Sequence, residues 1–219
     1  MHVLRFASLH LLAGLFLGAG LAADATAVEI DLLLGAPFTV RERPTLGPAD
    51  AAVIVIEVRS FQCNQCRAFH DKVFPLLSER YLKTGSIRWV MLDAPIAPDQ
   101  PNNPALEVAW AAHRQGRYWE MQDFLFEHAH RPSSILFGRA ATQPGIDASR
   151  LQSALSKGEA RSAMAADLAE ITALKVTALP TFILRKRKTE GGFTEARIDG
   201  YPTEAHFRSV LDGLMATPE

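Results

Sequence analysis

The sequence predicts an α/β protein in which a βαβ unit and a ββα unit share one mixed sheet, with a block of helices inserted between them. Three observations support this prediction. Val53–Val58 is a continuous β-branched and apolar run, which is typical of a buried central strand. A helical pattern and a second apolar run follow it directly. After a long Ala-rich stretch, two strand patterns and one helical pattern close the sequence.

The elements can be placed along the chain from these patterns. Residues 24–46 form a lead-in, residues 47–98 and 175–219 carry the sheet, and residues 99–174 form the helical insertion. We expect strands near 53–58, 87–92, 181–184 and 193–198, and helices near 67–83 (kinked at Pro75), 104–115, 117–129, 147–156, 159–174 and 203–215, with a short helix possible within 131–145.

The first residues have the pattern of a cleavable export signal. Arg5 precedes an apolar run, Leu11–Leu21, and small residues follow it up to Ala23. This order is typical of a secretory signal peptide, so we expect residues 1–23 to be removed, with cleavage at Ala27 as the alternative. An uncleaved membrane anchor is the other interpretation, but the apolar run is shorter than the roughly 20 residues that span a bilayer.

Composition and charge exclude several classes of function. Hydrophobic residues make up 48% of the 219 residues and charged residues 21%, which is ordinary for a globular protein. The net charge of −1 gives no sign of the basic face that a nucleic-acid partner requires. Two cysteines are too few for a scaffold held together by disulfides. We therefore expect no nucleic-acid partner and no stable membrane insertion of the mature chain.

The two cysteines form one C-x-x-C, at Cys63 and Cys66, where the first strand gives way to a helix. Unpaired N–H groups and the helix dipole stabilise a thiolate there, so we expect a lowered pKa at Cys63. Cys66 lies one turn later, close enough to attack a disulfide formed at Cys63. Arg67, and less directly His70, can add positive potential. A bond between residues so close in sequence closes almost no loop, which argues against a structural disulfide.

Half of a zinc site is the alternative interpretation of the pair. Zinc normally takes four ligands, and the sequence has no second C-x-x-C. His128 and His130 lie far along the chain, and we expect them at the surface. The pattern favours redox chemistry that needs no metal and no cofactor.

Two further features accompany the cysteines. Glu57 interrupts the apolar strand, and because a buried carboxylate tends to hold its proton, it can relay protons to or from Cys66. The alternative for Glu57 is a strand-end residue that reaches solvent. Leu179-Pro180 precedes the third strand, and proline tolerates a cis peptide bond, although a trans proline at a strand start is the alternative.

Together these residues resemble the DsbA-like branch of the thioredoxin superfamily. The matching segments are EVRSFQCNQCRAFH at 57–70, the helical stretch 109–127 with GRYW at 116–119, ALPTF at 178–182 and GYP at 200–202. The resemblance covers roughly residues 47–216 and implies a thioredoxin fold with an inserted α-helical subdomain.

The resemblance also implies roles for individual residues. Cys63 would be the exposed attacking cysteine, Cys66 the buried one, and Glu57 the buried acid of the family. A client peptide would pair with the backbone beside a cis Pro180, as an added strand does. The expected substrate-binding residues are Leu179, Pro180, Asn64 and Gln65.

The sequence departs from the family between the cysteines. Strong oxidants of this branch have Pro-His there, whereas this chain has Asn64-Gln65, whose amides donate only neutral hydrogen bonds. We therefore expect a less oxidising pair than in the strongest members.

The functional prediction is a periplasmic thiol–disulfide oxidoreductase that acts on client proteins with thiols or disulfides, with oxidation as the favoured direction. A membrane redox partner would recycle the pair. One alternative is a reductase of a dedicated pathway, fed by a membrane electron donor. The other is a non-catalytic client-binding module or chaperone on the same fold.

Overall fold

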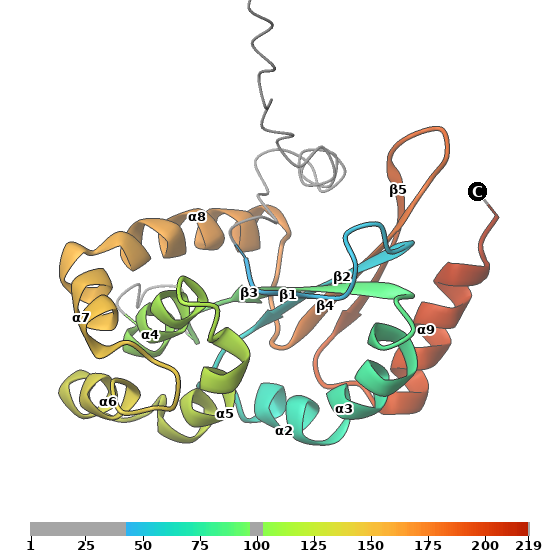
Figure 1. Cartoon of the computed structure of the whole chain (residues 1–219). Coiled ribbons are helices and arrows are strands. Elements are labelled where there is room, and N and C mark those ends of the chain that lie inside the picture. Colours follow the sequence, from blue (N-terminus) through green and yellow to red (C-terminus); the bar gives the residue numbers. More distant parts are fainter. Residues whose placement is uncertain (1–42, 97–102, 219) are drawn as a thin grey trace, which may run out of the picture.

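The computed structural model describes residues 43–96 and 103–218 (Figure 1). The predicted leader, residues 1–23, lies outside the described residues, as does most of the predicted lead-in. None of the helices within the described ranges is long and apolar enough to cross a bilayer.

The described residues form one mixed sheet of five strands in the order β1-β3-β2-β4-β5. β2 and β3 run parallel, and the other neighbouring strands pair antiparallel. β2 is therefore the central strand, and all seven of its residues are buried. The strand bounds are β1 Thr45–Leu46, β2 Val53–Arg59, β3 Ile87–Asp93, β4 Thr181–Arg187 and β5 Phe193–Asp199.

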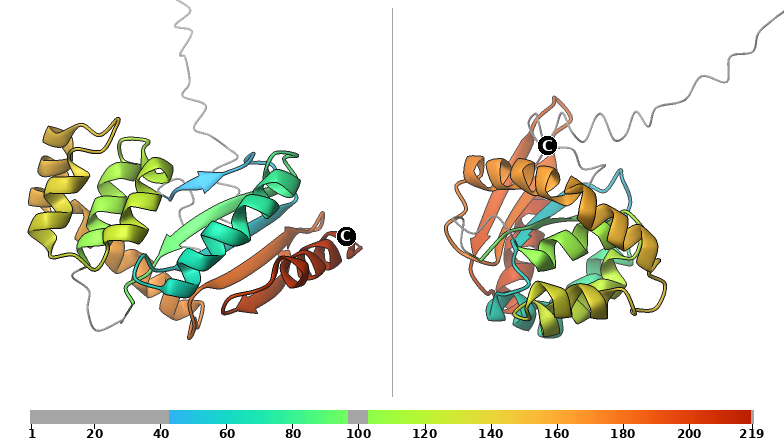
Figure 2. Two further views of the ribbon diagram at one scale, coloured as in Figure 1. Left: turned by 90° about the horizontal axis from the view of Figure 1, so that it is seen from below. Right: turned by 90° about the vertical axis from the view of Figure 1, so that its left-hand side faces the viewer.

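Helices cover both faces of the sheet and one end of it (Figures 1 and 2). α2, α3 and α9 lie on one face, α8 lies on the other, and the remaining helices stack at the end. The helix bounds are α2 Asn64–Lys72, α3 Phe74–Leu77, the π-helical turn η2 Ser78–Leu82, α4 Pro104–His113, α5 Tyr118–His128, α6 Ser133–Ala140, α7 Ala148–Lys157, α8 Glu159–Ala173 and α9 Glu204–Ala216.

The predicted fold class and the order of its elements are confirmed. The βαβ unit comes first, the helices α4 to α8 follow, and the β4–β5 hairpin and α9 complete the sheet. The larger apolar cluster includes Trp89, Phe182 and Phe207 under α2 and α9 and continues into the helical block. A smaller cluster on the opposite face packs β2, β3 and β4 against Ile171 of α8.

The structure corrects the sequence prediction in two places. The helix expected at 67–83 is divided into α2, α3 and η2, because Pro75 has no N–H to donate and its ring clashes with the preceding turn. The two-residue strand β1, which pairs with Val90 and Trp89 of β3, lies at the end of the predicted lead-in, where no strand was expected.

Candidate active site

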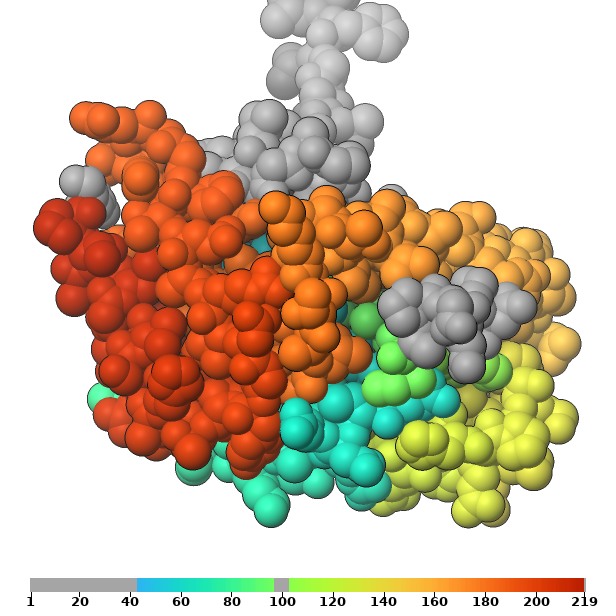
Figure 3. Space-filling view, turned by 180° about the vertical axis from the view of Figure 1, so that it is seen from behind, coloured from blue at the N-terminus to red at the C-terminus, as the bar shows by residue number. Residues whose placement is uncertain are grey.

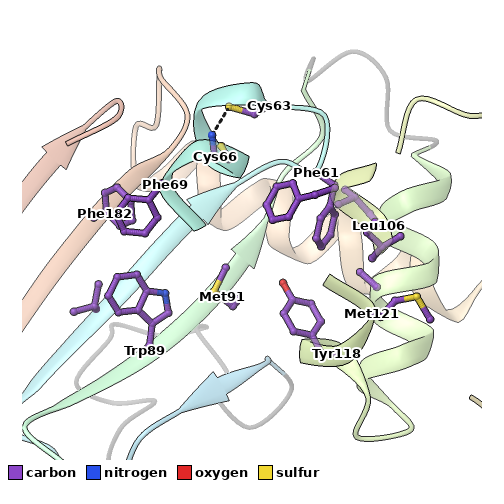
Figure 4. Close-up of a cluster of buried hydrophobic side chains, with 14 of the residues drawn as sticks. Phe61, Cys63, Cys66, Phe69, Trp89, Met91, Leu106, Tyr118, Met121 and Phe182 are labelled. Carbon is purple, nitrogen blue, oxygen red and sulfur yellow. Dashed lines mark hydrogen bonds between the residues drawn. The ribbon is translucent and has the colours of Figure 1, made fainter. Parts of the chain in front are cut away.

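Cys63 is the N-cap residue of α2, and its sulfur takes the place of the usual capping oxygen (Figure 4). β2 ends at Arg59, and a tight turn closed by the Cys63 N–H donating to Ser60 O, at 3.1 Å, brings the chain into the helix. The backbone N–H of Cys66 donates to Cys63 Sγ at 3.3 Å. A negative charge on this sulfur therefore meets an unpaired helix N–H and the positive end of the helix dipole.

The pKa of Cys63 is lowered to about 6. A hydrogen bond from the Cys66 thiol contributes most, followed among the favourable contributions by the backbone N–H groups of Cys66 and Gln65, while burial and the charge of Glu57 oppose them. The same hydrogen bond, and after it burial, raise the pKa of Cys66. The two sulfurs are thus unlike at neutral pH: Cys63 is a thiolate and Cys66 a thiol.

The exposure expected for Cys63 is wrong. Only 8% of the residue is exposed, against 0% for Cys66, and both cysteines are free. Cys63 is covered because its sulfur lies 3.6 Å from the carbonyl oxygen of Leu179 in the facing loop. Cys63 nevertheless remains the outer sulfur of the pair.

The peptide bond between Leu179 and Pro180 is cis, as the resemblance implied. Gly200 N–H donates to Pro180 O at 2.7 Å, and the Thr181 hydroxyl donates to Ala178 O at 2.8 Å. These two hydrogen bonds hold the loop against the start of β4, with the Leu179 carbonyl directed at the Cys63 sulfur.

The remaining predicted substrate residues lie at the open end of α2. Asn64 and Gln65 are exposed, and so is Arg67, which pairs with Asp71 at 3.6 Å and lies 4.0 Å from Glu127 of α5. From behind, α2 reaches the surface between the C-terminal part of the chain and the helical block (Figure 3).

Glu57 is fully buried on β2 and is held by two donors. His70 Nε2 lies 2.9 Å from Oε1 and 3.2 Å from Oε2, and Trp89 Nε1 donates to Oε2 at 2.8 Å. Burial raises the pKa of Glu57, but His70, Arg59 and Trp89 outweigh it and lower the pKa overall. The expectation that this acid holds its proton is therefore wrong, because the expectation did not include its partners.

His70 also differs from expectation, since burial lowers its pKa and it adds no positive charge beside Cys63. It lies one turn after Cys66 on α2, and only 3% of its side chain is exposed. The signal was present in the sequence as a histidine four residues after Cys66 on the apolar face of the helix.

Arg59 is a buried cation that sequence reasoning missed. Its Nε donates to Asp93 Oδ1 at 3.1 Å, its Nη2 donates to Tyr118 Oη at 2.8 Å, and Tyr118 Oη donates to Asp93 Oδ2 at 2.6 Å. The guanidinium carbon lies 4.8 Å from the ring centre of Phe61 and 5.0 Å from that of Phe126. This triad of Arg59, Asp93 and Tyr118 joins β2, β3 and α5.

The residue before Cys63 also contacts the helical block. Asn103 Nδ2 donates to Gln62 Oε1 at 2.8 Å, and Asn103 Oδ1 caps α4 by accepting from the N–H groups of Ala105 and Leu106. One buried side chain therefore both starts α4 and holds the turn that carries Cys63.

No group of three or more His, Cys, Asp or Glu side chains in 43–96 and 103–218 is arranged to hold a metal ion. His128, one of the histidines weighed as a zinc ligand, instead contacts Phe124 O at 2.9 Å and Arg139 Nη1 at 3.1 Å.

A C-x-x-C pair at a helix N-terminus, facing a cis-proline loop on a mixed sheet, defines the thioredoxin class of fold. The chain belongs to the thioredoxin family, because the family model described as thioredoxin matches residues 39–201. The fold is of the DsbA type. It matches the crystal structure of alpha-DsbA1 from Wolbachia pipientis with a TM-score of 0.68 at 21% identity, over 85% of this chain and 95% of that one.

Two relatives that are similar in sequence carry different names. A protein named Na(+)/H(+) antiporter NhaA 3 from Salinispora tropica is 32% identical over 152 residues, which is 67% of this chain and 22% of the relative. Disulfide bond formation protein D from Bacillus subtilis is 25% identical over 99 residues, 44% of each chain. The chain spans about a quarter of the length of the antiporter-named relatives that it matches.

Proposed function

We propose that the protein is a periplasmic thiol–disulfide oxidoreductase that oxidises client proteins through Cys63 and Cys66. The observation that carries this proposal is the Cys63 sulfur, which caps α2, has a pKa lowered to about 6 and lies 3.6 Å from the Leu179 carbonyl beside cis Pro180. The family membership and the relative named for disulfide bond formation support the same chemistry.

The reaction begins with the pair oxidised. A client thiolate attacks the Cys63 sulfur, the Cys63–Cys66 bond breaks, and Cys66 leaves as a thiolate that takes up a proton. A second client thiolate then attacks the client sulfur of the mixed disulfide and releases Cys63 as a thiolate. The client has lost two electrons and gained a disulfide, and the reduced pair passes those electrons to a membrane redox partner. The low pKa of Cys63 makes it a good leaving group in the second step.

The substrate-binding role belongs to the loop that faces Cys63. A client segment in extended conformation pairs with the backbone at Leu179 and Pro180 as an added strand, which places a client sulfur next to Cys63. Asn64 and Gln65, exposed at the start of α2, contact the residues flanking the client cysteine.

The direction of the reaction follows from how well the Cys63 thiolate is stabilised. A pKa of about 6 lies between about 7 for the attacking cysteine of thioredoxin and about 3.5 for that of the strongest oxidant of this fold. Potentials of the two differ by on the order of 150 mV, or about 7 kcal/mol for two electrons. We therefore place the pair between a general reductase and the strongest oxidants.

Two variants test the enzymatic role. Cys63→Ala should abolish oxidation of a reduced client peptide, because the attacking sulfur is missing. Cys66→Ala should accumulate a mixed disulfide with the client, detected by non-reducing electrophoresis and mass spectrometry. Retention of function by both variants would instead support the client-binding module.

The reduction potential, measured against glutathione, tests the direction. A value well above that of thioredoxin, about −270 mV, is expected. A value at the thioredoxin end, with turnover in an insulin-reduction assay and none on the reduced peptide, would replace the oxidase by the reductase.

Export rests on the N-terminal sequence pattern. We expect the protein recovered from a periplasmic fraction to begin after Ala23 or after Ala27. Recovery of the full chain from the cytoplasm would overturn this assignment.

A further inference from the structure

We propose that His70 is a positioning residue that keeps the Glu57 carboxylate ionised beneath the cysteine pair and thereby makes the pair less oxidising. This inference rests on the redox function proposed above. It extends that function from the two sulfurs to a second pair of side chains, one turn deeper in α2 and on the neighbouring strand β2.

The surroundings of His70 decide its protonation. Nε2 lies within hydrogen-bond distance of both Glu57 oxygens, whereas the buried Nδ1 has no hydrogen-bond partner among the described residues. The ring lies against aromatic neighbours, with ring centres 4.8 Å away at Phe74 and 5.6 Å away at Phe126. A second proton, on Nδ1, would be buried next to apolar side chains without an acceptor. His70 is therefore neutral, and its Nε2–H donates to Glu57, in agreement with the lowered pKa of the ring.

The Glu57 carboxylate depends on its donors because it has no contact with solvent. Hydrogen bonds from His70 and Trp89 reach its two oxygens, and Arg59 lies two residues further along β2. Trp89 belongs to β3, so the donors come from both sides of the carboxylate. Without His70, two interactions remain to stabilise the charged form of Glu57 against burial. They are the hydrogen bond from Trp89 and the charge of Arg59, which is already paired with Asp93 and Tyr118. The carboxylate should then take up a proton at neutral pH.

Other ionisable groups also face this pair, and each has a compensating partner. Cys63, the N-cap of α2, and Cys66 precede His70 on this helix and contact each other. Arg59 on β2 and Asp93 on β3 bind each other at 3.1 Å, and Tyr118 of α5 completes that triad. The charge that His70 controls is therefore that of Glu57.

That charge acts directly on the sulfurs. The Glu57 carboxylate raises the pKa of both Cys63 and Cys66, because a second negative charge nearby is unfavourable. A less stable thiolate makes the reduced form less favourable and so lowers the reduction potential. His70 therefore lowers the reduction potential of the pair. Asn64-Gln65 is expected to have the same effect, relative to the strongest oxidants of this fold.

The test compares two substitutions of His70 in the full chain. His70→Phe fits the surrounding aromatic rings but has no donor, so Glu57 should become protonated and the pKa of Cys63 should fall by about half a pH unit, about a threefold change in its acid dissociation constant. The equilibrium with glutathione should move at least about threefold toward reduced protein. His70→Gln keeps an N–H donor near the position of Nε2, and both quantities should stay at the wild-type value. The thiolate absorbance of the reduced protein gives the pKa without any exchange reaction.

A double-mutant cycle separates this role from a structural one. In the Glu57→Gln background, where no carboxylate is left, His70→Phe should produce no further shift. Three outcomes would each overturn the proposal. The first is that His70→Phe shifts the pKa of Cys63 equally with and without Glu57, and the second is that folded His70→Phe leaves this pKa unchanged. The third is that His70→Gln shifts this pKa as much as His70→Phe does. If His70→Phe does not fold, His70→Asn, whose amide is too short to reach Glu57, makes the same comparison. Loss of glutathione exchange in every variant and in the wild type would sink the redox function itself, while the absorbance titration would still test His70.

Discussion

A sulfur that serves as a helix cap explains most of the chemistry proposed for Cys63. Capping positions favour side chains with an acceptor, and a thiolate is an acceptor that carries a full negative charge. The Cys66 N–H at 3.3 Å and the thiol of the same residue both donate to it. Reactivity and local structure thus arise from the same hydrogen bonds.

The pH dependence of alkylation tests this arrangement. Reduced Cys63 should react with iodoacetamide with a midpoint near pH 6, while Cys66, whose pKa is raised, should stay unreactive over the same range. Cys66→Ala should move the midpoint up, because it removes the largest contribution to the low pKa. A midpoint near about 8.5, the value of a free cysteine, would contradict the structure.

The same titration affects stability. The pKa of Cys63 is lower in the folded state than in the unfolded state, so the reduced protein has the full gain above the unfolded pKa of about 8.5. The gain falls as the pH drops toward the folded pKa of about 6.

The site residues close to the cysteines in sequence could be predicted from the sequence. The site residues that only the fold places near the cysteines could not. Cys63 and Cys66 have a local signal in the C-x-x-C. The cis bond at Pro180 was implied by the family resemblance, because a Leu-Pro before a strand leaves cis and trans open. The protonation of Glu57 could not be predicted, since it depends on His70 and on Trp89, which lies 32 residues away on β3.

At the scale of elements, β2 carries two charged residues on one face of a central strand. Glu57 and Arg59 are two positions apart, so their side chains point to the same side of the sheet. Both are buried, and each forms hydrogen bonds with side chains from neighbouring elements. A strand with a continuous apolar pattern can therefore hold charge at its carboxyl end.

Removal of Arg59 should lower the stability of the folded protein. Arg59→Met leaves the partly buried Asp93 carboxylate without its cation, so the free energy of unfolding should fall by about 3 kcal/mol at pH 7 in urea denaturation. Burial raises the pKa of Asp93, so the variant should recover part of this loss at pH 5, where the carboxyl takes up a proton.

Tyr118→Phe is the matched control for that prediction. It removes one hydroxyl from the same triad and no charge, and should cost about 1–2 kcal/mol with little dependence on pH between 5 and 7. Equal losses in the two variants at both pH values would show that the charge of Arg59 does not matter for stability.

Most helices and strands could be predicted from the periodicity and length of their apolar runs. The exceptions are elements that form only through contacts with other parts of the chain. β2, β3 and the β4–β5 hairpin have apolar or alternating runs of their own. β1 has only two residues and is defined by its pairing with β3. Gly47, which follows β1, has φ +86°, and a Cβ there would lie 2.3 Å from Ile87 O, so the approach of these segments depends on a glycine.

At the scale of the molecule, the helical block and the sheet are joined at the active site. Asn103 hydrogen-bonds to Gln62, beside Cys63, and Tyr118 hydrogen-bonds to Arg59 and Asp93 at the ends of β2 and β3. The sequence predicted the block as helices, but its contacts with the sheet depend on side chains that are distant in sequence.

The redox state should change the stability of the whole protein. A bond between Cys63 and Cys66 closes almost no loop and adds little to stability, while the reduced form gains the hydrogen-bonded thiolate. The Tm of the reduced protein should therefore exceed that of the oxidised protein by about 5 °C at pH 7. The difference should shrink at pH 5, below the pKa of Cys63. A higher Tm for the oxidised form at pH 7 would contradict net oxidation of clients.

The central position of β2 has a further consequence. Strands at the rim of a sheet open first, and β1 and β5 form the two rims here. Two charged side chains near the sulfurs, Glu57 and Arg59, are carried by β2, which we expect to separate after the rims. We therefore expect loosening at the rims to leave Glu57 buried and the pKa of Cys63 unchanged.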